Sequence, residues 1–202
     1  MSQTRPSSDP VEIDASDPLR LHDVDHVRFY CGNAKQAAYF YAWNFGFQVE
    51  QYRDLTTGSR DTASYLLRQG NIRLILETGL TADHEAAHEV VTYGDGVKDV
   101  SLTVNDAEAA YEQAIRNGAE SGYEPIEETD EHGTVVRAAI RSYGRVLHTF
   151  VSRKGDYGLN AVRAGGRFGP GWEKVSHFPL NEYNRQNPVS YTHLTLPTKQ
   201  AV

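Results

Sequence analysis

The chain has little sulfur and no long apolar run, and both absences exclude classes of protein. Cys31 is the single cysteine among 202 residues, so no disulfide forms within the chain, which suits a reducing compartment. No stretch approaches the roughly 20 apolar residues that a membrane helix needs. Residues 1–20 lack the apolar segment of a signal peptide and are predicted to be a disordered leader. We therefore expect a cytoplasmic protein.

Basic side chains are also scarce. Twenty Lys and Arg residues stand against 27 Asp and Glu, which gives a net charge of -7. No basic cluster along the chain could neutralise a row of phosphate groups. We expect neither nucleic acid nor an anionic membrane surface as a partner.

Residues 21–153 contain the same order of predicted elements twice. In the first copy, residues 24–31 alternate polar and apolar side chains like a half-buried strand, and Asn33 begins a helix that Gly46 ends. Three more strands are predicted at about 47–53, 61–68 and 71–77.

The second copy follows a short polar helix predicted at about 82–91. A strand over 97–104 precedes a helix that Asn105 is predicted to cap and Gly118 to end. Three strands are again predicted, at about 121–127, 134–142 and 146–152. The predicted caps are 72 residues apart, whereas the strands align best at an offset of 73, so the repeat has slipped by one residue between strand and helix.

This internal repeat predicts an α+β fold of two paired βαβββ modules, about 21–80 and 95–153, which form a half-open barrel. The apolar face of the first strand of each module is expected to pack under its helix. The polar faces then point to the concave side, and they carry His26, Arg28, Tyr30, Asp99, Ser101 and Thr103.

The rest of the chain differs in character. Residues 154–187 are rich in Gly, Asn and aromatic side chains without a clear period, and are predicted to be an interdomain linker that starts a truncated C-terminal half. Residues 188–202 contain VSYTHLTLPT, which matches the in-frame translation of a sequencing adapter. This tail is predicted to be an assembly scar, and the natural gene is expected to continue beyond residue 187.

Several separated motifs carry a resemblance to a known family. They are FYCGNAKQAAYFYAWNFGFQ, GSRDTASYLLRQGNIRLIL, HEVVTYGDGVKDVSLTV and DEHGTVVRAAIRSYGRVLHTFV, in this order. The chain from about Leu21 to Asn187 resembles the N-terminal half of the 4-hydroxyphenylpyruvate dioxygenase family, which has the vicinal oxygen chelate (glyoxalase-like) fold. The related 4-hydroxymandelate synthase shares this half and stays open as an alternative.

The resemblance implies an Fe(II) enzyme of aromatic amino acid catabolism that converts the 2-oxo acid 4-hydroxyphenylpyruvate and oxygen to homogentisate and carbon dioxide. A triad of two histidines and one carboxylate holds the iron, and in this family it lies in the C-terminal half. No catalytic, metal or cofactor-binding residue is therefore assigned in this chain, which is expected to be inactive and free of cofactor. A homo-oligomer is expected.

A vestigial counterpart of the iron site is a rival hypothesis. Aligning the strands of the two modules places His26 and Asp99 at the two histidine positions of the fold and Thr149 near the carboxylate position. One imidazole, one carboxylate and one hydroxyl form a weak ligand set for Fe(II). We expect a polar interior that is satisfied by hydrogen bonds.

Two other motifs resemble functional sites, but we favour a purely structural interpretation of each. His84 to His88 fits the H-E-x-x-H pattern of zinc peptidases but lacks a long helix and a third ligand, so a solvated surface helix is expected. The glycine-rich run from Gly165 to Gly171 lacks the Lys-Ser/Thr ending of a phosphate loop and is expected to be linker.

Aromatic side chains are dense between residues 39 and 47. Tyr41 and Phe45 are expected in the core, and some of the others are expected at an interface: Tyr39, Phe40, Trp43 and Phe47.

Three classes of function remain open. The chain is a non-catalytic N-terminal half, an autonomous chelate-fold enzyme that uses His26 and Asp99, or a metal-free binding module that forms a symmetric dimer. The continuous match to one family favours the first.

Overall fold

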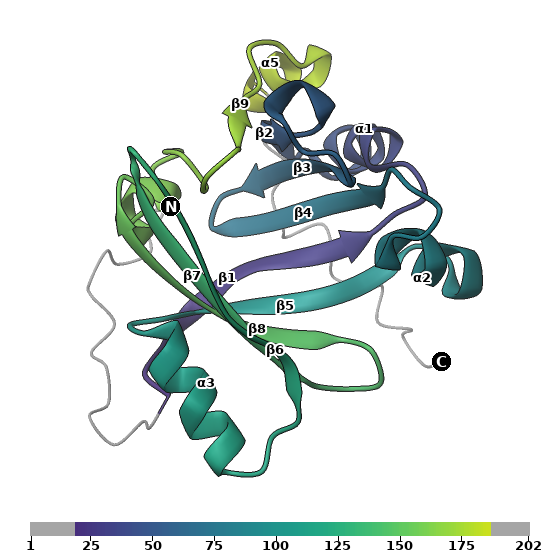
Figure 1. Ribbon diagram of the computed structural model, residues 1–202. Helices are drawn as coiled ribbons and strands as arrows, with labels where there is room; N and C mark the ends of the chain where they lie inside the picture. The colour runs from purple at the N-terminus through teal and green to yellow at the C-terminus, as the bar shows by residue number, and fades with distance from the viewer. Residues whose placement is uncertain (1–18, 187–202) are drawn as a thin grey trace, which may run out of the picture.

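One bent mixed sheet organises the molecule. The computed structural model describes residues 19–186, so the predicted leader up to residue 18 and the predicted scar at 188–202 lie outside the described residues. Nine strands follow the order β6-β7-β8-β5-β1-β4-β3-β2-β9. In Figure 1 the sheet is strongly bent, with α1 and α3 on its outer side. This arrangement confirms the predicted pair of βαβββ modules.

The first module follows the predicted order of elements. The side chain of Asn33 accepts a hydrogen bond from the backbone N–H of Gln36, and Gly46 ends the helix in the left-handed region at φ 72°. Both predicted caps of this helix are thus confirmed. The elements are β1 (Leu21–Tyr30), α1 (Ala34–Phe45), β2 (Gln48–Arg53), the 3-10 turn η1 (Leu55–Thr57), β3 (Thr62–Gln69) and β4 (Ile72–Gly79).

The second module repeats this order after a connecting helix. Its hairpin turn lies between Asp130 and Gly133, as the sequence pattern indicates. The elements are α2 (Glu85–Tyr93), β5 (Gly96–Val104), α3 (Ala107–Arg116), β6 (Ser121–Asp130), β7 (Gly133–Arg141) and β8 (Leu147–Gly155).

The N-cap of α3 differs from the prediction. Asp106 is the N-cap, and its carboxylate accepts from the N–H of Ala109 at 3.1 Å. The amide oxygen of Asn105 instead lies 2.6 Å from Nε2 of His22. Either residue type can cap a helix, but a carboxylate interacts more favourably with the positive end of the helix dipole. Asp106 follows Asn33 by 73 positions, the offset of the strands, so the predicted slip in the repeat was wrong.

The C-terminal end of α3 agrees with the prediction. The C-cap is Asn117, with φ -85°, and Gly118 follows it in the left-handed region at φ 93°. The N–H of Gly118 donates to the carbonyl of Ile115 and that of Ala119 to the carbonyl of Ala114, so the glycine ends the helix as predicted.

The two modules join edge to edge. β1 pairs with β4 in parallel and β5 pairs with β8 in parallel, while β1 and β5 pair antiparallel across the junction. The junction register places His26 opposite Ser101 and Arg28 opposite Asp99. The polar faces predicted for the first strand of each module therefore share one side of the sheet.

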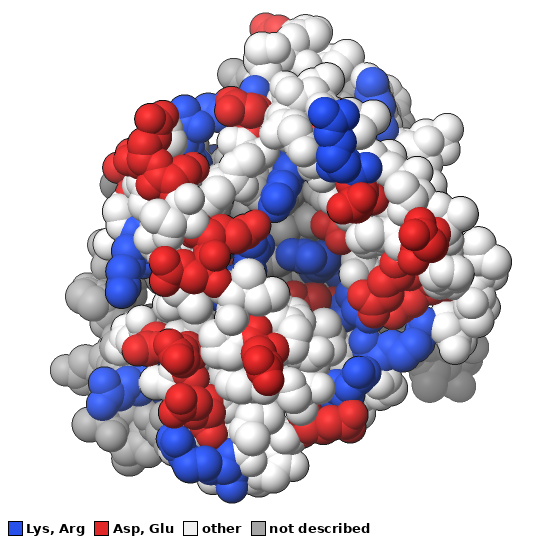
Figure 2. Space-filling view, in the orientation of Figure 1, with Lys and Arg blue, Asp and Glu red and all other residues white. Residues whose placement is uncertain are grey.

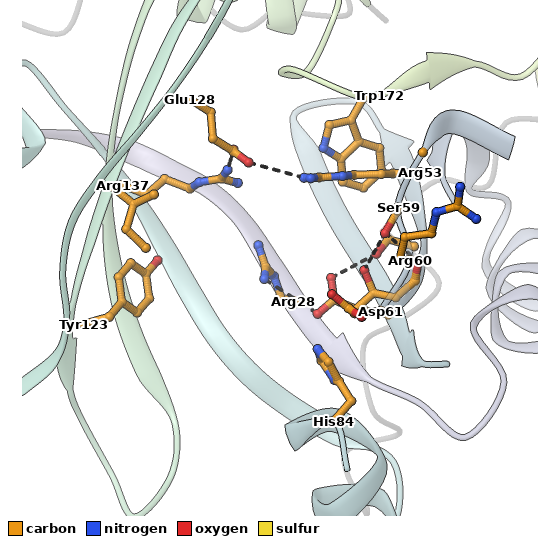
Figure 3. Close-up of a pocket in the computed structure, with 15 residues that line it drawn as sticks. Arg28, Arg53, Ser59, Arg60, Asp61, His84, Tyr123, Glu128, Arg137 and Trp172 are labelled. Carbon is orange, nitrogen blue, oxygen red and sulfur yellow. Dashed lines mark hydrogen bonds and ion pairs between the residues drawn. The ribbon is translucent and has the colours of Figure 1, made fainter. Parts of the chain in front are cut away.

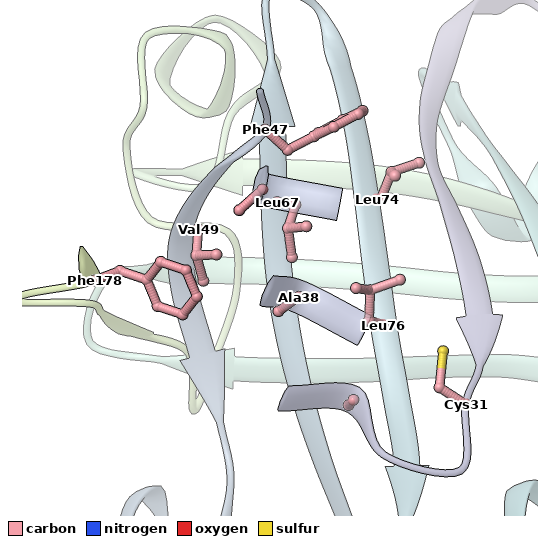
Figure 4. Packing of buried hydrophobic residues seen from close by; sticks show 10 residues of the cluster. Cys31, Ala38, Phe47, Val49, Leu67, Leu74, Leu76 and Phe178 are labelled. Atoms are coloured by element: carbon pink, nitrogen blue, oxygen red, sulfur yellow. The ribbon is translucent and has the colours of Figure 1, made fainter. Parts of the chain in front are cut away.

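The apolar faces form two cores under the two helices. Three alanines of α1 face the sheet at one-turn spacing, and three alanines of α3 do the same, so each helix approaches closely. Figure 4 shows the first core, where Phe47, Leu67 and Leu76 pack with Phe178 from the C-terminal segment. The buried alanines are Ala34, Ala38 and Ala42 in α1, and Ala107, Ala110 and Ala114 in α3.

The segment after β8 folds back onto the sheet. It contains α4 (Leu159–Arg163), β9 (Glu173–Lys174) and α5 (Pro179–Gln186). β9 pairs with the edge strand β2, and the side chain of Asn181 continues this pairing, because its amide donates to the carbonyl of Val49 and accepts from the N–H of Val49. These bonds cover the edge of β2. The predicted linker role of 154–187 stays a prediction.

Candidate functional site

The concave side of the sheet holds a polar cavity of about 540 Å³. Figure 2 shows a hollow at the centre of this face, with basic side chains inside it and acidic ones around its rim. Side chains from both modules line it, on β1, β3, β4, β6 and β7. They include Arg28, Ser64, Glu77, Tyr123, Glu128 and Arg137.

Arginines outnumber carboxylates among the inner residues of the cavity. Nη1 of Arg28 lies 3.8 Å from Oε1 of Glu77, whose other oxygen accepts from the hydroxyl of Ser64. Glu128 is shared by two arginines, since it pairs with Arg53 at 3.6 Å and also with Arg137. Three guanidinium groups therefore meet two carboxylates. Figure 3 shows the three arginines and Glu128 around one open space.

Burial and charge set the protonation states in the cavity. Burial and the nearby positive charge of Arg28 lower the pKa of Arg137 to about 10. Burial also opposes the charge of Arg28, but the carboxylates of Glu77 and Asp99 outweigh it and raise the pKa of that guanidinium. Burial raises the pKa of the Tyr123 phenol. At neutral pH the cavity therefore presents two half-buried cations and a phenolic hydroxyl.

The candidate residues His26, Asp99 and Thr149 lie together in one buried chain of hydrogen bonds. Nδ1 of His26 lies 2.7 Å from Asp25, and Nε2 lies 3.1 Å from the hydroxyl of Ser101. That hydroxyl donates to Asp99 at 2.7 Å, and the N–H of Thr149 donates to the other oxygen of Asp99 at 3.1 Å. Both nitrogens of the imidazole and both oxygens of the carboxylate are thus engaged.

Three residues of this hydrogen-bonded series follow the order of a serine-hydrolase triad. Asp25, His26 and Ser101 follow one another as carboxylate, imidazole and hydroxyl. However, the three residues are 0%, 1% and 0% exposed, so no substrate reaches the hydroxyl. The arrangement stabilises the junction of β1 and β5 and is not a nucleophilic site.

The family model that describes the Glyoxalase/Bleomycin resistance protein/Dioxygenase superfamily matches residues 23–148. This range covers both βαβββ modules up to β8. The chain belongs to this superfamily. Both the family model and the sheet topology thus confirm the predicted glyoxalase-like fold.

Two curated relatives with the same name match this chain. The chain is 41% identical over 172 residues to 4-hydroxyphenylpyruvate dioxygenase of Dictyostelium discoideum, a match that covers 84% of this chain and 44% of the relative. It is 45% identical over 131 residues to the enzyme of that name from Caenorhabditis elegans, covering 64% of this chain and 33% of the relative. The predicted resemblance is confirmed, and the chain spans less than half the length of these relatives.

Solved structures support the same fold. A variant of 4-hydroxymandelate synthase from Streptomyces coelicolor superposes with a TM-score of 0.60 at 23% identity, covering 73% of this chain and 44% of that one. Methylmalonyl-CoA epimerase from Mycobacterium tuberculosis superposes with a TM-score of 0.54 at 18% identity, covering 69% of this chain and 92% of the epimerase. At these identities the likeness concerns the fold alone.

The described residues of this chain do not fit the Fe(II) site that the name 4-hydroxyphenylpyruvate dioxygenase implies. Across residues 19–186, no three His, Cys, Asp or Glu side chains converge as a metal site. His26 and Asp99 are held by other protein groups, and the hydroxyl of Thr149 lies 3.1 Å from the phenol of Tyr123.

The H-E-x-x-H motif is divided between several structural roles. His84 precedes α2 as its N-cap, and its Nδ1 accepts from the N–H of Ala86. Glu85 is bound at 2.5 Å by the ammonium of Lys98, and His88 is exposed. The two histidines therefore do not share a helix face, and the predicted surface-helix interpretation agrees with this geometry.

The glycine-rich run lies between α4 and β9, against the core. Its Phe168 is 2% exposed and packs with Trp172, Leu66 and Ile75. The N–H of Phe168 donates to the side chain of Gln51. No strand enters the run and no helix follows it directly, so it has no phosphate-loop geometry.

The aromatic residues of α1 divide by face. Tyr41 and Phe45 pack against the first core, as predicted, and Phe47 is buried in it. Phe40 and Trp43 are 55% and 66% exposed.

Within the described residues, no helix is long and apolar enough to cross a membrane.

Sequence reasoning found only part of the cavity. Arg28 was noted as part of the polar face of its strand, but Glu77, Tyr123 and Arg137 were missed. A usable signal was present, because a charged residue inside an apolar strand, as in VVRAAI and LILET, is rarely buried unless it is paired or functional. Which of these charges face one another depended on the pairing of the modules.

Proposed function

We propose that this chain is the N-terminal, non-catalytic half of a 4-hydroxyphenylpyruvate dioxygenase. The observation that carries this proposal is the unequal coverage of the matches. The Dictyostelium relative aligns with 84% of this chain but only 44% of its own length. The remaining part of such a protein would then contain the iron ligands that are absent among residues 19–186.

In this proposal the whole protein converts 4-hydroxyphenylpyruvate and oxygen to homogentisate and carbon dioxide. When bound, Fe(II) would supply the activation of oxygen, with the 2-oxo acid group of the substrate as its chelating ligand. The residues of this chain do not hold the metal and do not touch the reacting atoms. A cytoplasmic location, suggested by the buried single thiol of Cys31, belongs to the same proposal.

The role of this half is to support the catalytic half and the contacts between subunits. Phe40 and Trp43 present exposed aromatic surface on α1, while the other face of the helix is anchored in the core through Ala38 and Ala42. A rigid helix with aromatic side chains on its outer face suits a protein contact. This observation supports the expected homo-oligomer or a contact with the second half.

An anaerobic Fe(II) titration tests the absence of a metal site. The purified chain is titrated beside its His26→Ala variant, and metal content and colour are followed as 4-hydroxyphenylpyruvate is added. We expect no stoichiometric iron and no colour change in either protein. One tightly bound iron that is lost in the variant would make this chain a chelate site in its own right and contradict the proposal.

A chimera tests the positive claim. Residues 21–186 replace the matching segment of the Dictyostelium relative, and oxygen uptake and homogentisate are measured beside the unaltered relative. We expect the chimera to retain turnover, because this half supplies support and no reacting group. A chimera that is folded and loaded with iron but produces no homogentisate would overturn the proposal.

A further inference from the structure

The cavity of about 540 Å³ on the concave side of the sheet contains a buried donor without a partner. Nε of Arg28 is buried and meets no hydrogen-bond acceptor among the described residues. A buried cationic N–H without an acceptor is costly. The side chain faces the cavity (Figure 3), so a group that enters the cavity is placed to satisfy it.

The neighbouring carboxylates do not remove this demand. Glu77 is shared between Arg28 and Ser64, and Glu128 is shared between Arg53 and Arg137. Asp99 also favours the charge of Arg28, but its oxygens are occupied by Ser101 and by the backbone of Thr149. Nε of Arg28 is therefore a donor without an acceptor among the described residues, while Oε2 of Glu128 pairs with Arg137 but accepts no hydrogen bond.

The shape and the walls of the cavity suit a small organic molecule. Its volume lies within the roughly 300–1,000 Å³ range of ligand pockets. Trp172 and Tyr123 contribute aromatic surface, and Ile126 contributes apolar surface. Exposed Arg60 and Asp61 lie at the rim, where their charges offset one another.

We propose that this cavity binds a small organic carboxylate, whose oxygens are received by Arg28 and Arg137 and whose body lies against Tyr123 and Trp172. The planar guanidinium group matches the two oxygens of a carboxylate. The hydroxyl of Tyr123 lies 3.1 Å from that of Thr149, and it can donate to a ligand when Thr149 is the donor of that contact. This inference goes beyond the proposed function and does not depend on where iron binds.

Trp172 makes the site directly observable. The chain contains two tryptophans, and the other one, Trp43, is exposed on α1 away from the cavity. In a Trp43→Phe background, the fluorescence of Trp172 reports occupation of the cavity. The probes are cyclohexanecarboxylate, its uncharged amide and inorganic phosphate, none of which absorbs in the tryptophan band.

We expect a saturable fluorescence change with cyclohexanecarboxylate at a dissociation constant of about 1 mM or tighter. The amide should produce no saturable change, and phosphate should require higher concentrations than the carboxylate. Failure of the carboxylate to saturate, or equal binding of the amide, would overturn the proposal. Tighter binding of phosphate would overturn the assignment to a carboxylate. These three titrations use no arginine variant, so their outcome does not depend on whether such a variant folds.

Arginine variants then assign the residues. Arg28→Gln and Arg137→Gln should each weaken the binding of cyclohexanecarboxylate by about tenfold or more. Arg116→Gln is the matched control, since this arginine is exposed on α3 and pairs with Glu112 outside the cavity. Circular dichroism checks that each variant is folded. Unchanged affinity in folded Arg28→Gln and Arg137→Gln would show that the anion is bound elsewhere and contradict the proposal.

Discussion

The ion pair between Asp25 and Arg153 is almost completely buried, and it connects β1 with β8. Nε and Nη2 of Arg153 donate to the two carboxylate oxygens at 3.0 and 2.9 Å. Burial alone would raise the pKa of Asp25, but Arg153 and His26 outweigh it and hold that pKa well below its ordinary value. Arg73 adds a bond from its Nε to the carbonyl of Asp25. The pair therefore stays charged at neutral pH.

Breaking this pair should be costly. Arg153→Met leaves a buried carboxylate without its partner, and we expect the free energy of unfolding to fall by about 3–5 kcal/mol. Urea denaturation measures the loss. Arg163→Met is the matched control, because Arg163 pairs with Asp23 at 2.6 Å where both side chains are more than a third exposed, and its loss should be about 1 kcal/mol or less. Equal losses in the two variants would contradict the importance of burial.

His26 should make stability depend on pH. Burial lowers its pKa below 6.5, although Asp25 opposes the shift. Below about pH 6.5 the unfolded chain binds a proton that the folded chain does not, so the free energy of unfolding falls as the pH decreases. Urea denaturation at about pH 7.5 and pH 5.5 should show a smaller decrease in His26→Asn than in the parent chain.

The control for this pH effect is an exposed histidine. His88→Gln on α2 should retain the decrease of the parent chain, because its side chain is exposed. A decrease that is the same in His26→Asn and in the parent chain would show that other groups cause the pH dependence.

Among the elements, α3 offers a direct test of which residue caps it. Asp106→Ala removes the acceptor of the Ala109 N–H and should lower the free energy of unfolding by about 1 kcal/mol. Asn105→Ala removes only an exposed contact with His22 and should cost about 0.5 kcal/mol or less. Thermal unfolding of both variants measures the difference. A larger loss for Asn105→Ala would restore the sequence-based assignment of the cap.

The strands and helices could be predicted from the sequence because each depends on nearby residues. The alternation of Val27 and Phe29 with His26 and Arg28 is enough to define both the strand and its two faces. The N-cap of α3 could not be chosen, because Asn105 and Asp106 are adjacent and both residue types are strongly preferred as caps. The strand β9 was missed, because two residues carry no periodicity and depend on the edge of β2.

At the scale of the whole molecule, the segment after β8 acts as part of the domain. Phe168 and Trp172 bury Leu66 and Ile75 of the sheet, and Phe178 joins the first core. The apolar surface that it covers gives the segment a stabilising role.

Two truncations test this role. Ending the chain after Gly155 should expose the surfaces of Leu66 and Ile75 and cause loss of cooperative unfolding or aggregation. Ending it after Gln186 should change the free energy of unfolding by about 0.5 kcal/mol or less, as the predicted scar at 188–202 implies. Thermal unfolding and size-exclusion chromatography distinguish the two. A stable, monodisperse chain that ends at Gly155 would show that the segment is only a linker.

The sequence by itself determined the repeated βαβββ order, the faces of the first strand in each module, the caps of α1 and the family. These features follow from local spacing and from motifs that are contiguous in the chain. Only the tertiary structure decided that Arg28 and Arg137 line one cavity, that Asp99 is held by Ser101 and Thr149, and that Asn181 covers the edge of β2. Each of these contacts joins residues on different elements, so strand pairing and packing across the sheet had to bring them together.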